Sequence, residues 1–334
     1  MGTGRVLAVV GATAAGKSDL AVALALRLCA DGSPAEIVNA DSMQLYRGMN
    51  IGTAKSPQHE RWGVGHHLID VLDPREPASV AVVRDLAREI VADCHRRDVI
   101  PIVVGGSALY VHAILDEMEF PPTDPEVRAR IEEDAQLLGS RVMHARLAQI
   151  DPVAAAAIPA GNLRRVVRAL EVVEITGGPY PASLPEPVYA YDSVLQVGID
   201  VDRDVLAERI DHRVDRMWAA GLVAEVRQLA AAGLADAPTA SRALGYAQIL
   251  AFLDGTVSEA EARSATVAGT RRFARRQLSW FRRDRRIHWL PGDAPDLVER
   301  AWTLVSAGVQ GAQGDGAYGD PRPGADSVSG DAEG

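Results

Sequence analysis

The chain has 334 residues, 47% of them hydrophobic and 24% charged, which is enough to bury a full core in one large or two medium domains. No apolar run is long enough to span a membrane, and Val6–Val10 is too short for a signal segment. Cys29 and Cys94 lack CxxC spacing, which argues against a disulfide framework or a zinc site. We therefore expect a cytoplasmic protein with no membrane partner. The net charge of −10 argues weakly against a nucleic-acid partner.

Strands and helices alternate through the first 120 residues. Val6–Val10, Glu36–Ala40 and Ile100–Val104 are short apolar runs typical of buried strands. Lys17–Ala30 and Ser79–Arg96 have the composition and periodicity of helices. This alternation predicts an α/β fold, a parallel sheet covered by helices on both faces.

Helical patterns replace the alternation after Phe120, where prolines mark a boundary. Glu126–Glu174 has only helical patterns, and a Gly/Pro loop at Thr176–Pro187 follows it. Leu195–Val201 predicts a strand that returns to the sheet. Two long helical stretches then follow, Asp204–Ala232 and Glu259–Arg283, of which we expect the second to end the ordered part.

These boundaries predict a discontinuous P-loop core, residues 1–120 and 195–306, interrupted by an all-helical insertion of residues 121–194. Residues 307–334 are mostly Gly, Asp, Ser and Pro with little to bury, so we predict a disordered tail.

A phosphate-binding loop follows the first predicted strand. Gly11–Ser18 reads GATAAGKS, which fits G-x-x-x-x-G-K-[ST] between a strand and a helix. Glycines let backbone amides turn toward a phosphate, and the helix N-terminus adds partial positive charge. Lys17 offers a charge to phosphate oxygens, and the Ser18 hydroxyl can bind Mg²⁺. The predicted phosphate-binding residues are Gly11, Ala12, Thr13, Ala14, Ala15, Gly16, Lys17 and Ser18.

The motif identifies a phosphate holder without identifying a reaction. Most such loops serve ATP or GTP chemistry, and those enzymes usually carry a magnesium-binding acid at a strand end. The run Ile100–Val104 ends instead in Gly105-Gly106-Ser107. Asp41 follows another strand, and carboxyl ends of neighbouring parallel strands face one crevice, so it should lie near the loop. Its local sequence fits a turn cap equally well.

A basic segment lies near the end of the predicted core. Between Arg271 and Arg286 there are eight arginines and one acid, and such local charge governs short-range contact because salt screens beyond about 10 Å. Helical spacing places Arg272, Arg276 and Arg283 on one face and Ala274, Leu278 and Phe281 on another. The spacing predicts an outward arginine ridge suited to phosphates. We expect Trp280 to pack in the core rather than stack on a base.

A pair of histidines and a second group of arginines are the remaining polar features of the sequence. His66 and His67 are adjacent and should point in different directions, which favours hydrogen bonding over a joint metal site. Arg164, Arg165 and Arg168 form a second basic cluster within the predicted insertion.

Seven segments, in order from about residue 6 to 286, closely resemble those of bacterial tRNA dimethylallyltransferases, also called tRNA isopentenyltransferases. The segments are GATAAGKS, NADSMQLYRGMNIGTAK (Asn39–Lys55), HHLIDVLDP (His66–Pro74), PIVVGGSALY (Pro101–Tyr110), RRVVRALEV (Arg164–Val172) with Thr176-Gly177, LGYAQI (Leu244–Ile249) and TRRFARRQLSWFRRD (Thr270–Asp284). Three positions depart from the family pattern. Asn50 replaces an Asp, Ser107 replaces a Thr and keeps the hydroxyl, and Ala160-Gly161-Asn162 replaces Pro-Asn-Asp, which puts a tRNA contact by Asn162 in doubt.

The resemblance implies a prenyl transfer from dimethylallyl diphosphate to N6 of adenosine 37, in the anticodon stem-loop of tRNAs that read codons beginning with U. With Ser18 in the loop we expect Mg²⁺ as cofactor, and we expect a monomer because nothing in the sequence suggests a large exposed interface. Asp41 would be the general base, assisted by Ser107, with Lys17 and the loop holding the leaving diphosphate. The target base would have to leave its stack. The implied tRNA-binding residues are Asp41, Ser42, Met43, Gln44, Ser107, Arg128, Arg164, Arg165, Arg168, Arg242, Tyr246, Arg275, Arg276, Gln277 and Arg282.

Three other functions remain open on the sequence. A P-loop kinase or NTPase for a small molecule explains the loop but leaves the arginine ridge unexplained. The related adenylate isopentenyltransferases, which prenylate free AMP, ADP or ATP, would not need that ridge. A noncatalytic RNA-binding protein would tolerate the loss of Lys17.

Overall fold

A parallel six-stranded sheet forms the centre of the computed structural model, which describes residues 4–182 and 186–311. Its strand order is β3-β2-β4-β1-β5-β6, and each neighbouring pair is parallel. The strands are β1 (Arg5–Gly11), β2 (Ala35–Asn39), β3 (His66–His67), β4 (Ile100–Gly105), β5 (Ser193–Asp200) and β6 (Ile287–Pro291). The predicted P-loop α/β fold is confirmed.

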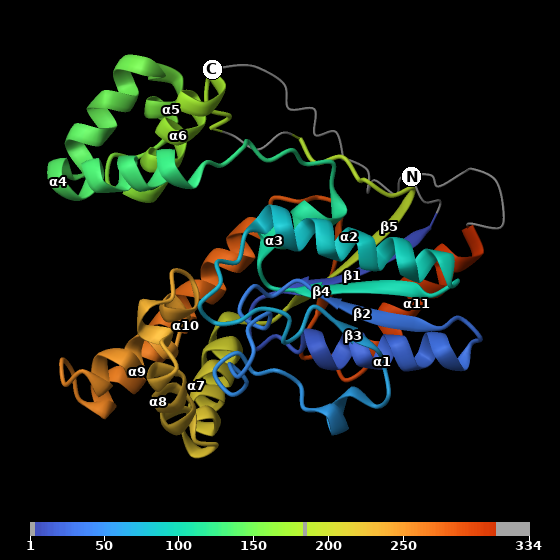
Figure 1. The fold of residues 1–334 in the computed structure, drawn as a ribbon. Helices are drawn as coiled ribbons and strands as arrows, with labels where there is room; N and C mark the ends of the chain where they lie inside the picture. The colour runs from blue at the N-terminus through green and yellow to red at the C-terminus, as the bar shows by residue number, and fades with distance from the viewer. Residues whose placement is uncertain (1–3, 183–185, 312–334) are drawn as a thin grey trace, which may run out of the picture.

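Helices cover both faces of the sheet (Figure 1). The helices are α1 (Lys17–Ala30), α2 (Val80–Arg96), α3 (Ala108–Leu115), α4 (Pro125–Ile150), α5 (Pro152–Ala157), α6 (Leu163–Thr176), α7 (Arg203–Ala219), α8 (Leu222–Ala231), α9 (Tyr246–Leu253), α10 (Glu259–Phe281) and α11 (Leu297–Gly311), with short 3-10 turns at Gln58–Arg61, Leu234–Asp236 and Ala240–Arg242. In the described ranges, no helix combines the length and hydropathy needed to cross a membrane.

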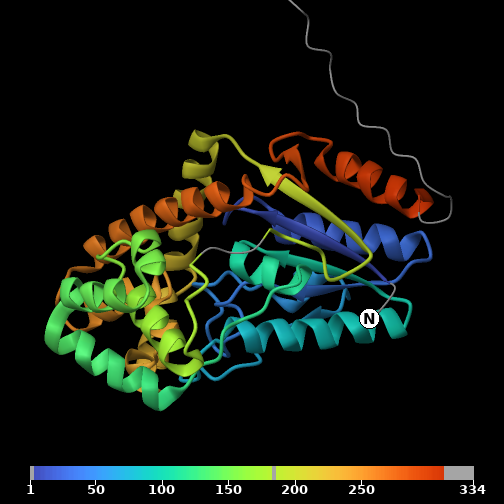
Figure 2. The ribbon, with the colours of Figure 1, turned by 90° about the horizontal axis from the view of Figure 1, so that it is seen from above.

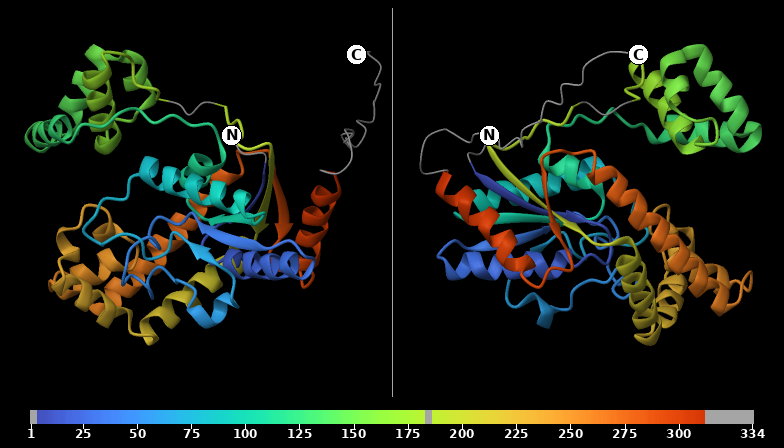
Figure 3. Two further views of the ribbon diagram at one scale, coloured as in Figure 1. Left: turned by 45° about the vertical axis from the view of Figure 1, so that its right-hand side comes forward. Right: turned by 180° about the vertical axis from the view of Figure 1, so that it is seen from behind.

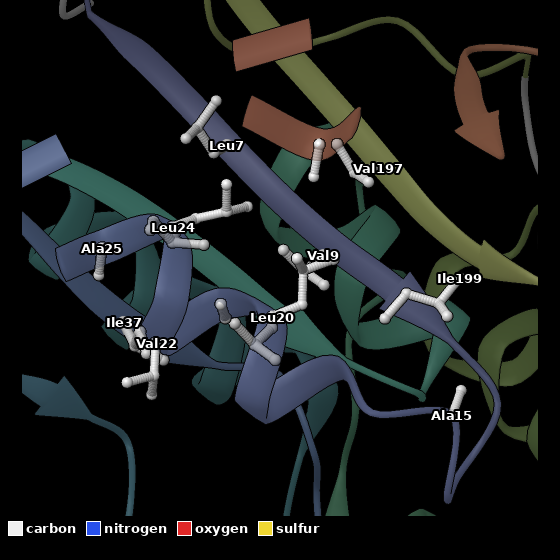
Figure 4. Close-up of a cluster of buried hydrophobic side chains, with 14 of the residues drawn as sticks. Leu7, Val9, Ala15, Leu20, Val22, Leu24, Ala25, Ile37, Val197 and Ile199 are labelled. Carbon is white, nitrogen blue, oxygen red and sulfur yellow. The ribbon is translucent and has the colours of Figure 1, made fainter. Parts of the chain in front are cut away.

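The two faces have separate cores because side chains alternate along each strand. Leu7 and Val9 of β1 point toward α1, where they pack with Leu20 and Leu24 (Figure 4). Their neighbours on β1 pack toward α2 and α3, in a cluster that includes Val83, Val91 and Ile114. Because both faces of β1 are buried, the strand is apolar from Val6 to Val10.

The predicted insertion, residues 121–194, contains α4, α5 and α6, which pack around a core of their own that includes Ile131, Leu147 and Leu170. Figures 1 and 3 show this cluster standing away from the sheet on two connecting segments. The segments pair where they leave the core, since Asp116 and Tyr189 form an antiparallel bridge.

A second helical group, α7 to α10, extends from the same side of the molecule (Figures 1 and 2). Tyr46 and Met49, from the segment after β2, pack with Leu222, Val226 and Ile249 of α8 and α9. The carboxyl ends of the strands therefore lie between two helical groups, the insertion (α4 to α6) and the group α7 to α10 (Figure 1).

The ordered part of the chain extends further than the sequence predicted. The helix expected to end the ordered part is followed by β6 and α11, and α11 runs to Gly311, past the boundary set at residue 307. Ala301 and Val305 of α11 are fully buried against the core that contains α1. The remaining predicted tail, residues 312–334, lies outside the described residues.

Candidate active site at the carboxyl ends of the strands

The phosphate loop joins the end of β1 to the first turn of α1. Gly16 immediately precedes α1 with a φ of 97°, a conformation that suits glycine, and Ala14 has a φ of 63°. These backbone conformations let the loop turn back over the start of the helix. Residues 11–18 therefore form one contiguous loop, as the motif predicts.

Lys17 is the first residue of α1, and its side chain lies inside the loop. The ammonium Nζ donates a hydrogen bond to the carbonyl oxygen of Ala12 at 2.7 Å. Burial lowers the pKa of Lys17 to about 8, with Asp41 opposing the shift and Arg213 adding to it. A cation this poorly solvated gains strongly from an anionic ligand.

Two cavities meet beside the loop and share Thr13, Asp41 and Arg213 in their walls. The smaller, of about 70 Å³, is also lined by Lys17, Ser18, Asn39, Gln44 and His66. The larger, of about 370 Å³, is within the usual size range of ligand sites. Its other walls are Ser42, Met43, Gly52, Thr53, Ser107, Val214, Met217, Arg242, Ala243, Leu244, Thr266, Thr270, Phe273 and Arg276.

Asp41 both caps a turn and faces the cavities, so the two interpretations of this residue are compatible. Its Oδ1 accepts a hydrogen bond from the Met43 backbone N–H at 2.9 Å. Its own N–H donates to Oδ1 of Asn39 at 3.0 Å, and Asn39 Nδ2 donates to the Leu68 carbonyl at 2.9 Å. Local bonds thus hold the Asp41 carboxylate where both cavities meet.

Ser107 precedes α3 at the end of β4 and lines the larger cavity. It stands at the N-cap position, yet its hydroxyl makes no capping hydrogen bond. Serine at this position normally caps the helix. The Ser107 hydroxyl is therefore available to a molecule in the cavity.

Arg213 of α7 lines both cavities, and the sequence reading missed it. Burial lowers the pKa of this guanidinium, and Asp41 opposes the shift. A sequence signal exists, because Arg213 falls on the apolar stripe of its helix with Leu206, Ile210 and Met217 at spacings of three to four residues. A lone arginine on an apolar helix face needs an anionic partner.

The residues after Asp41 that the family resemblance assigns to tRNA binding line the two cavities. Ser42 and Met43 line the larger cavity, and Gln44 lines the smaller one while its Nε2 donates to the Thr53 carbonyl at 3.1 Å. Arg242 is exposed and lines the larger cavity.

Two of the residues expected to bind RNA, Tyr246 and Gln277, have side chains that point inward. Tyr246 is fully buried, and its hydroxyl donates to Glu225 at 2.6 Å. The same Glu225 carboxylate accepts the backbone N–H groups of Asn50 and Ile51. Gln277 is only 6% exposed and bonds to backbone atoms of the core. Neither side chain lies on the outer surface of its helix, although Gln277 lines the smaller cavity.

Three of the insertion arginines are engaged within the chain. Arg128 and Arg168 both bind the fully buried carboxylate of Glu171, the second at 2.7 Å. Arg165 donates to the Ala182 carbonyl at 2.6 Å. Arg164 is exposed and forms no ion pair with residues 4–182 or 186–311.

The expected ridge is present on α10 for Arg272 and Arg276 but not for Arg283. Arg272, Arg275 and Arg276 are exposed on the helix, opposite the buried Ala274 and Phe281. The helix ends at Phe281, so Arg283 follows it on a turn. Arg282 forms an exposed ion pair with Asp200 at 3.0 Å. The expectation for Trp280 was wrong, since this side chain is 41% exposed and lies on the surface with the arginines.

The adjacent histidines point apart, as predicted. His66 lines the smaller cavity, with Nδ1 2.8 Å from the Val64 carbonyl, whereas His67 Nε2 lies 2.7 Å from Glu36. Cys94 is near the same carboxylate at 3.6 Å. Arg97 donates to both Glu36 oxygens at 2.8 Å and so supplies the cation that this cluster needs.

The walls of the smaller cavity suit a hard cation beside a phosphate. Ser18 is exposed there, and the oxygens of Thr13 and Asp41 lie in the same wall. Mg²⁺ prefers oxygen ligands and keeps several waters, so it needs few protein donors. The donor set therefore fits Mg²⁺ bound mainly through a phosphate, with Ser18 as a protein ligand.

Comparison with known proteins bears on this arrangement. A family model described as IPP transferase matches residues 44–284. The chain is 61% identical to a tRNA dimethylallyltransferase of Thermobifida fusca over 90% of this chain and 94% of that protein. It is 60% identical to a protein of the same name from Kineococcus radiotolerans, over 90% of this chain and 96% of that one.

Solved structures agree. A tRNA isopentenylpyrophosphate transferase of Bacillus halodurans is 37% identical, with a TM-score of 0.67 over 92% of this chain and 97% of that one. A eukaryotic dimethylallyltransferase acting on tRNA shares the fold, with a TM-score of 0.75 over 92% of this chain and 80% of that one, at 24% identity. A phosphate loop, an aspartate in the wall shared by two cavities and matches along most of its length together show that the chain belongs to the IPP transferase family.

Proposed function

We propose that this protein transfers a dimethylallyl group from dimethylallyl diphosphate to the N6 amine of adenosine 37 in tRNAs that read codons beginning with U. The products are N6-dimethylallyladenosine and diphosphate. The observation that carries the proposal is the position of Asp41, in the shared wall of the lysine-containing cavity and the larger cavity. A leaving group and a nucleophile can thus meet at one carboxylate.

The phosphate loop serves the leaving group. As the bond between the allylic carbon and the diphosphate oxygen breaks, its electron pair goes to the diphosphate. Lys17 and Arg213 are two poorly solvated cations beside that position, and both stabilise the growing negative charge. In this use of the loop no phosphoryl group moves.

Asp41 and Ser107 serve the nucleophile. The N6 lone pair forms the new bond to the allylic carbon, and the nitrogen then loses a proton to the Asp41 carboxylate. The uncapped Ser107 hydroxyl stands in the wall of the same cavity and can hydrogen-bond the amine. An ordinary carboxylate suffices here, because the nitrogen becomes acidic only as the bond forms.

Mg²⁺ held at Ser18 would neutralise part of the diphosphate charge when bound. The residues of the chain have the remaining tasks. Lys17 and the loop amides orient the diphosphate, and Asp41 holds its position through the Met43 amide, so that both reactants are aligned.

The RNA partner is proposed to be an anticodon stem-loop. Arg275 and Arg276 are exposed on α10, and Arg276 also lines the larger cavity. Arg242 joins them at the cavity wall. These cations can hold the phosphates beside a base that has left its stack. We propose that the enzyme acts as a monomer in the cytoplasm.

The test is a product assay. The protein is incubated with Mg²⁺, dimethylallyl diphosphate and unmodified tRNA. Mass spectrometry of the digested nucleosides identifies the product, and mass spectrometry of ribonuclease-generated oligonucleotides gives its position in the tRNA. We expect dimethylallyladenosine at position 37, and an Asp41→Asn variant that loses about 10²- to 10⁴-fold in kcat while it retains tRNA binding.

Parallel reactions with AMP and with ATP alone separate the rival functions. Prenylated AMP without prenylated tRNA would show a free-nucleotide prenyltransferase. Phosphate release from ATP without any prenylated product would show an NTPase. Full turnover by Asp41→Asn would remove Asp41 as the base.

A further inference from the structure

Gln277 is a polar residue on the buried face of α10. It lies between Ala274 and Phe281, which are 2% and 0% exposed, and is itself 6% exposed. Its exposed neighbours are the arginines of the ridge. Burying an amide costs free energy unless both its donor and its acceptor are paired, so the partners of Gln277 indicate why it is there.

Both halves of the amide bind the backbone of the candidate active site. Oε1 accepts the N–H of Thr13 at 2.8 Å, and Nε2 donates to the carbonyl of Gly106 at 2.8 Å. These partners lie 264 and 171 residues away in the sequence. One side chain therefore connects the phosphate loop after β1 to the turn after β4.

The close approach at Gly106 shows that this position is built for the amide. A Cβ added at Gly106 would stand 2.4 Å from Gln277 Nε2 and 3.3 Å from the Gly11 carbonyl oxygen. No side chain could occupy that space without moving the glutamine away. Glycine at 106 thus lets α10, β1 and β4 meet at hydrogen-bond distance.

The two connected backbone segments carry the reacting groups of the proposed function. Thr13 lies in the wall shared by both cavities, and Ser107 directly follows the carbonyl that Gln277 binds. Holding Thr13 fixes the loop that grips the diphosphate. Holding Gly106 fixes the turn that presents the Ser107 hydroxyl.

We infer, on the basis of the proposed function, that Gln277 is a positioning residue. It sets the separation between the phosphate loop and Ser107, and hence between the leaving group and the nucleophile, and it makes no contact with RNA. A displacement of about 1 Å between reacting groups can cost roughly 100-fold in rate. Its loss should therefore lower kcat rather than weaken tRNA binding.

The first variant is Gln277→Met, which keeps the length of the side chain and removes both hydrogen bonds. Gln196→Met is the matched control, because Gln196 is 2% exposed and its amide bonds to Tyr189 and Asp284 outside both cavities. We expect Gln277→Met to lower kcat about 100-fold at 25 °C, with the KM for tRNA and its salt dependence within twofold of the wild type. Gln196→Met should lower Tm but keep kcat.

A second variant protects the test against a folding defect. In Gln277→Glu the ionised carboxylate can accept from Thr13 but cannot donate to Gly106, whereas the protonated acid can do both. The kcat of this variant, divided by that of the wild type at the same pH, should rise at least tenfold as pH falls from 8 to 5.5. A lost fold would not be recovered by acid.

The outcomes distinguish a failure of the proposed function from a failure of the positioning role of Gln277. No prenylated nucleoside from the wild type would end the proposed function itself. An active wild type with an equally active Gln277→Met variant would overturn the positioning role. A rise in the KM for tRNA with unchanged kcat would also overturn it and would show that Gln277 contacts RNA. A kcat ratio for Gln277→Glu that does not change with pH would overturn it as well.

Discussion

The arginines of the insertion and those of α10 carry the same charge but have different surroundings. Arg128 and Arg168 share the buried carboxylate of Glu171. Arg275 and Arg276 are exposed, and neither forms an ion pair with any residue in the ranges 4–182 and 186–311. Arg128 joins α4 to Glu171 of α6, and Arg168 binds the same carboxylate from within α6, whereas Arg275 and Arg276 are free to bind phosphate.

This difference teaches that a basic motif has two possible uses, which burial distinguishes. A guanidinium already paired with a buried carboxylate must give up that partner before it can bind RNA, at a high cost. An exposed one gives up only water and counterions. The family resemblance assigns both pairs to RNA, whereas the structure predicts that Arg128 and Arg168 act mainly on the shape of the insertion.

Removing Glu171 breaks the first half of this comparison and should have the largest effect. Glu171→Ala leaves Arg128 and Arg168 without their shared carboxylate and frees the Asp124 N–H, which Glu171 accepts at 3.1 Å. We expect a loss of about 3–5 kcal/mol in the stability of the insertion. Hydrogen exchange should speed up in α4 and α6 and stay unchanged in β1.

The control is Glu174→Ala, since Glu174 pairs with Arg130 at the surface, where both side chains are more than a third exposed. An exposed pair is worth about 0–1 kcal/mol. Equal effects of the two variants would contradict the structural role of Glu171. A large loss of tRNA affinity with unchanged exchange in α4 would assign Arg128 and Arg168 directly to RNA.

A change of pH sharpens the comparison, because arginines of both regions stay charged while Lys17 does not. The pKa of Lys17 is lowered to about 8, so Lys17 is protonated below pH 8 and loses its charge above it. Before diphosphate binds, Lys17 titrates freely, so kcat/KM for dimethylallyl diphosphate should fall tenfold per unit above pH 8, about 100-fold by pH 10. Affinity for tRNA should change little between pH 7 and 9.

The pH profile is measured with saturating tRNA and limiting diphosphate donor. Lys17→Arg is the control, because its guanidinium stays charged over this range and should flatten the profile. A wild-type profile that is flat up to pH 9.5 would mean that Lys17 does not titrate near 8. It would also show that burial does not lower the pKa of Lys17.

The second half of the comparison predicts unequal effects along α10. Arg276→Ala should remove about one phosphate contact, which lowers the salt slope of tRNA binding by about one and the affinity roughly eightfold at 0.1 M salt. Arg282→Ala should do less, because Arg282 already has Asp200 at 3.0 Å. Binding titrations from 0.05 to 0.3 M salt measure both. Equal slopes for the two variants would contradict the distinction between free and paired arginines.

Much of the fold could be predicted because local patterns and tertiary contacts agree in its elements. The predicted helix at Lys17–Ala30 matches α1, and the buried strands β1, β2 and β4 differ from prediction by one residue at their ends. The two-residue β3 has no periodicity to detect. β6 is a short run that follows a long basic segment and becomes recognisable only through its pairing with β5. Leu297, Ala301 and Val305 of α11 recur every four residues, a helical signal that the sequence prediction missed.

Site residues could be predicted where the local sequence and the strand order fix their position. They could not be predicted where their exposure depends on packing between distant segments. Asp41 and Ser107 follow strand ends, so topology places them at the cavities. The burial of Gln277 could be predicted, because it lies three residues after Ala274 and four before Phe281 on the buried face of α10. Tyr246 and Trp280 could not be placed, because their burial depends on contacts from distant segments. An aromatic in a basic helix is exposed or buried according to contacts from distant segments.

Asn162 gives the smallest predicted effect, and it tests the same distinction between shape and contact. It is the N-cap of α6, where its side chain accepts the backbone N–H of Arg165 at 3.3 Å. Asn162→Ala should cost α6 about 1 kcal/mol, and Asn162→Asp should preserve the cap, because an aspartate accepts the same N–H. Hydrogen exchange in the first turn of α6 measures the cost. If Asn162→Ala weakened tRNA binding tenfold without faster exchange, then Asn162 would contact RNA, and the departure of Ala160-Gly161-Asn162 from the family pattern would bear on recognition and not on helix capping alone.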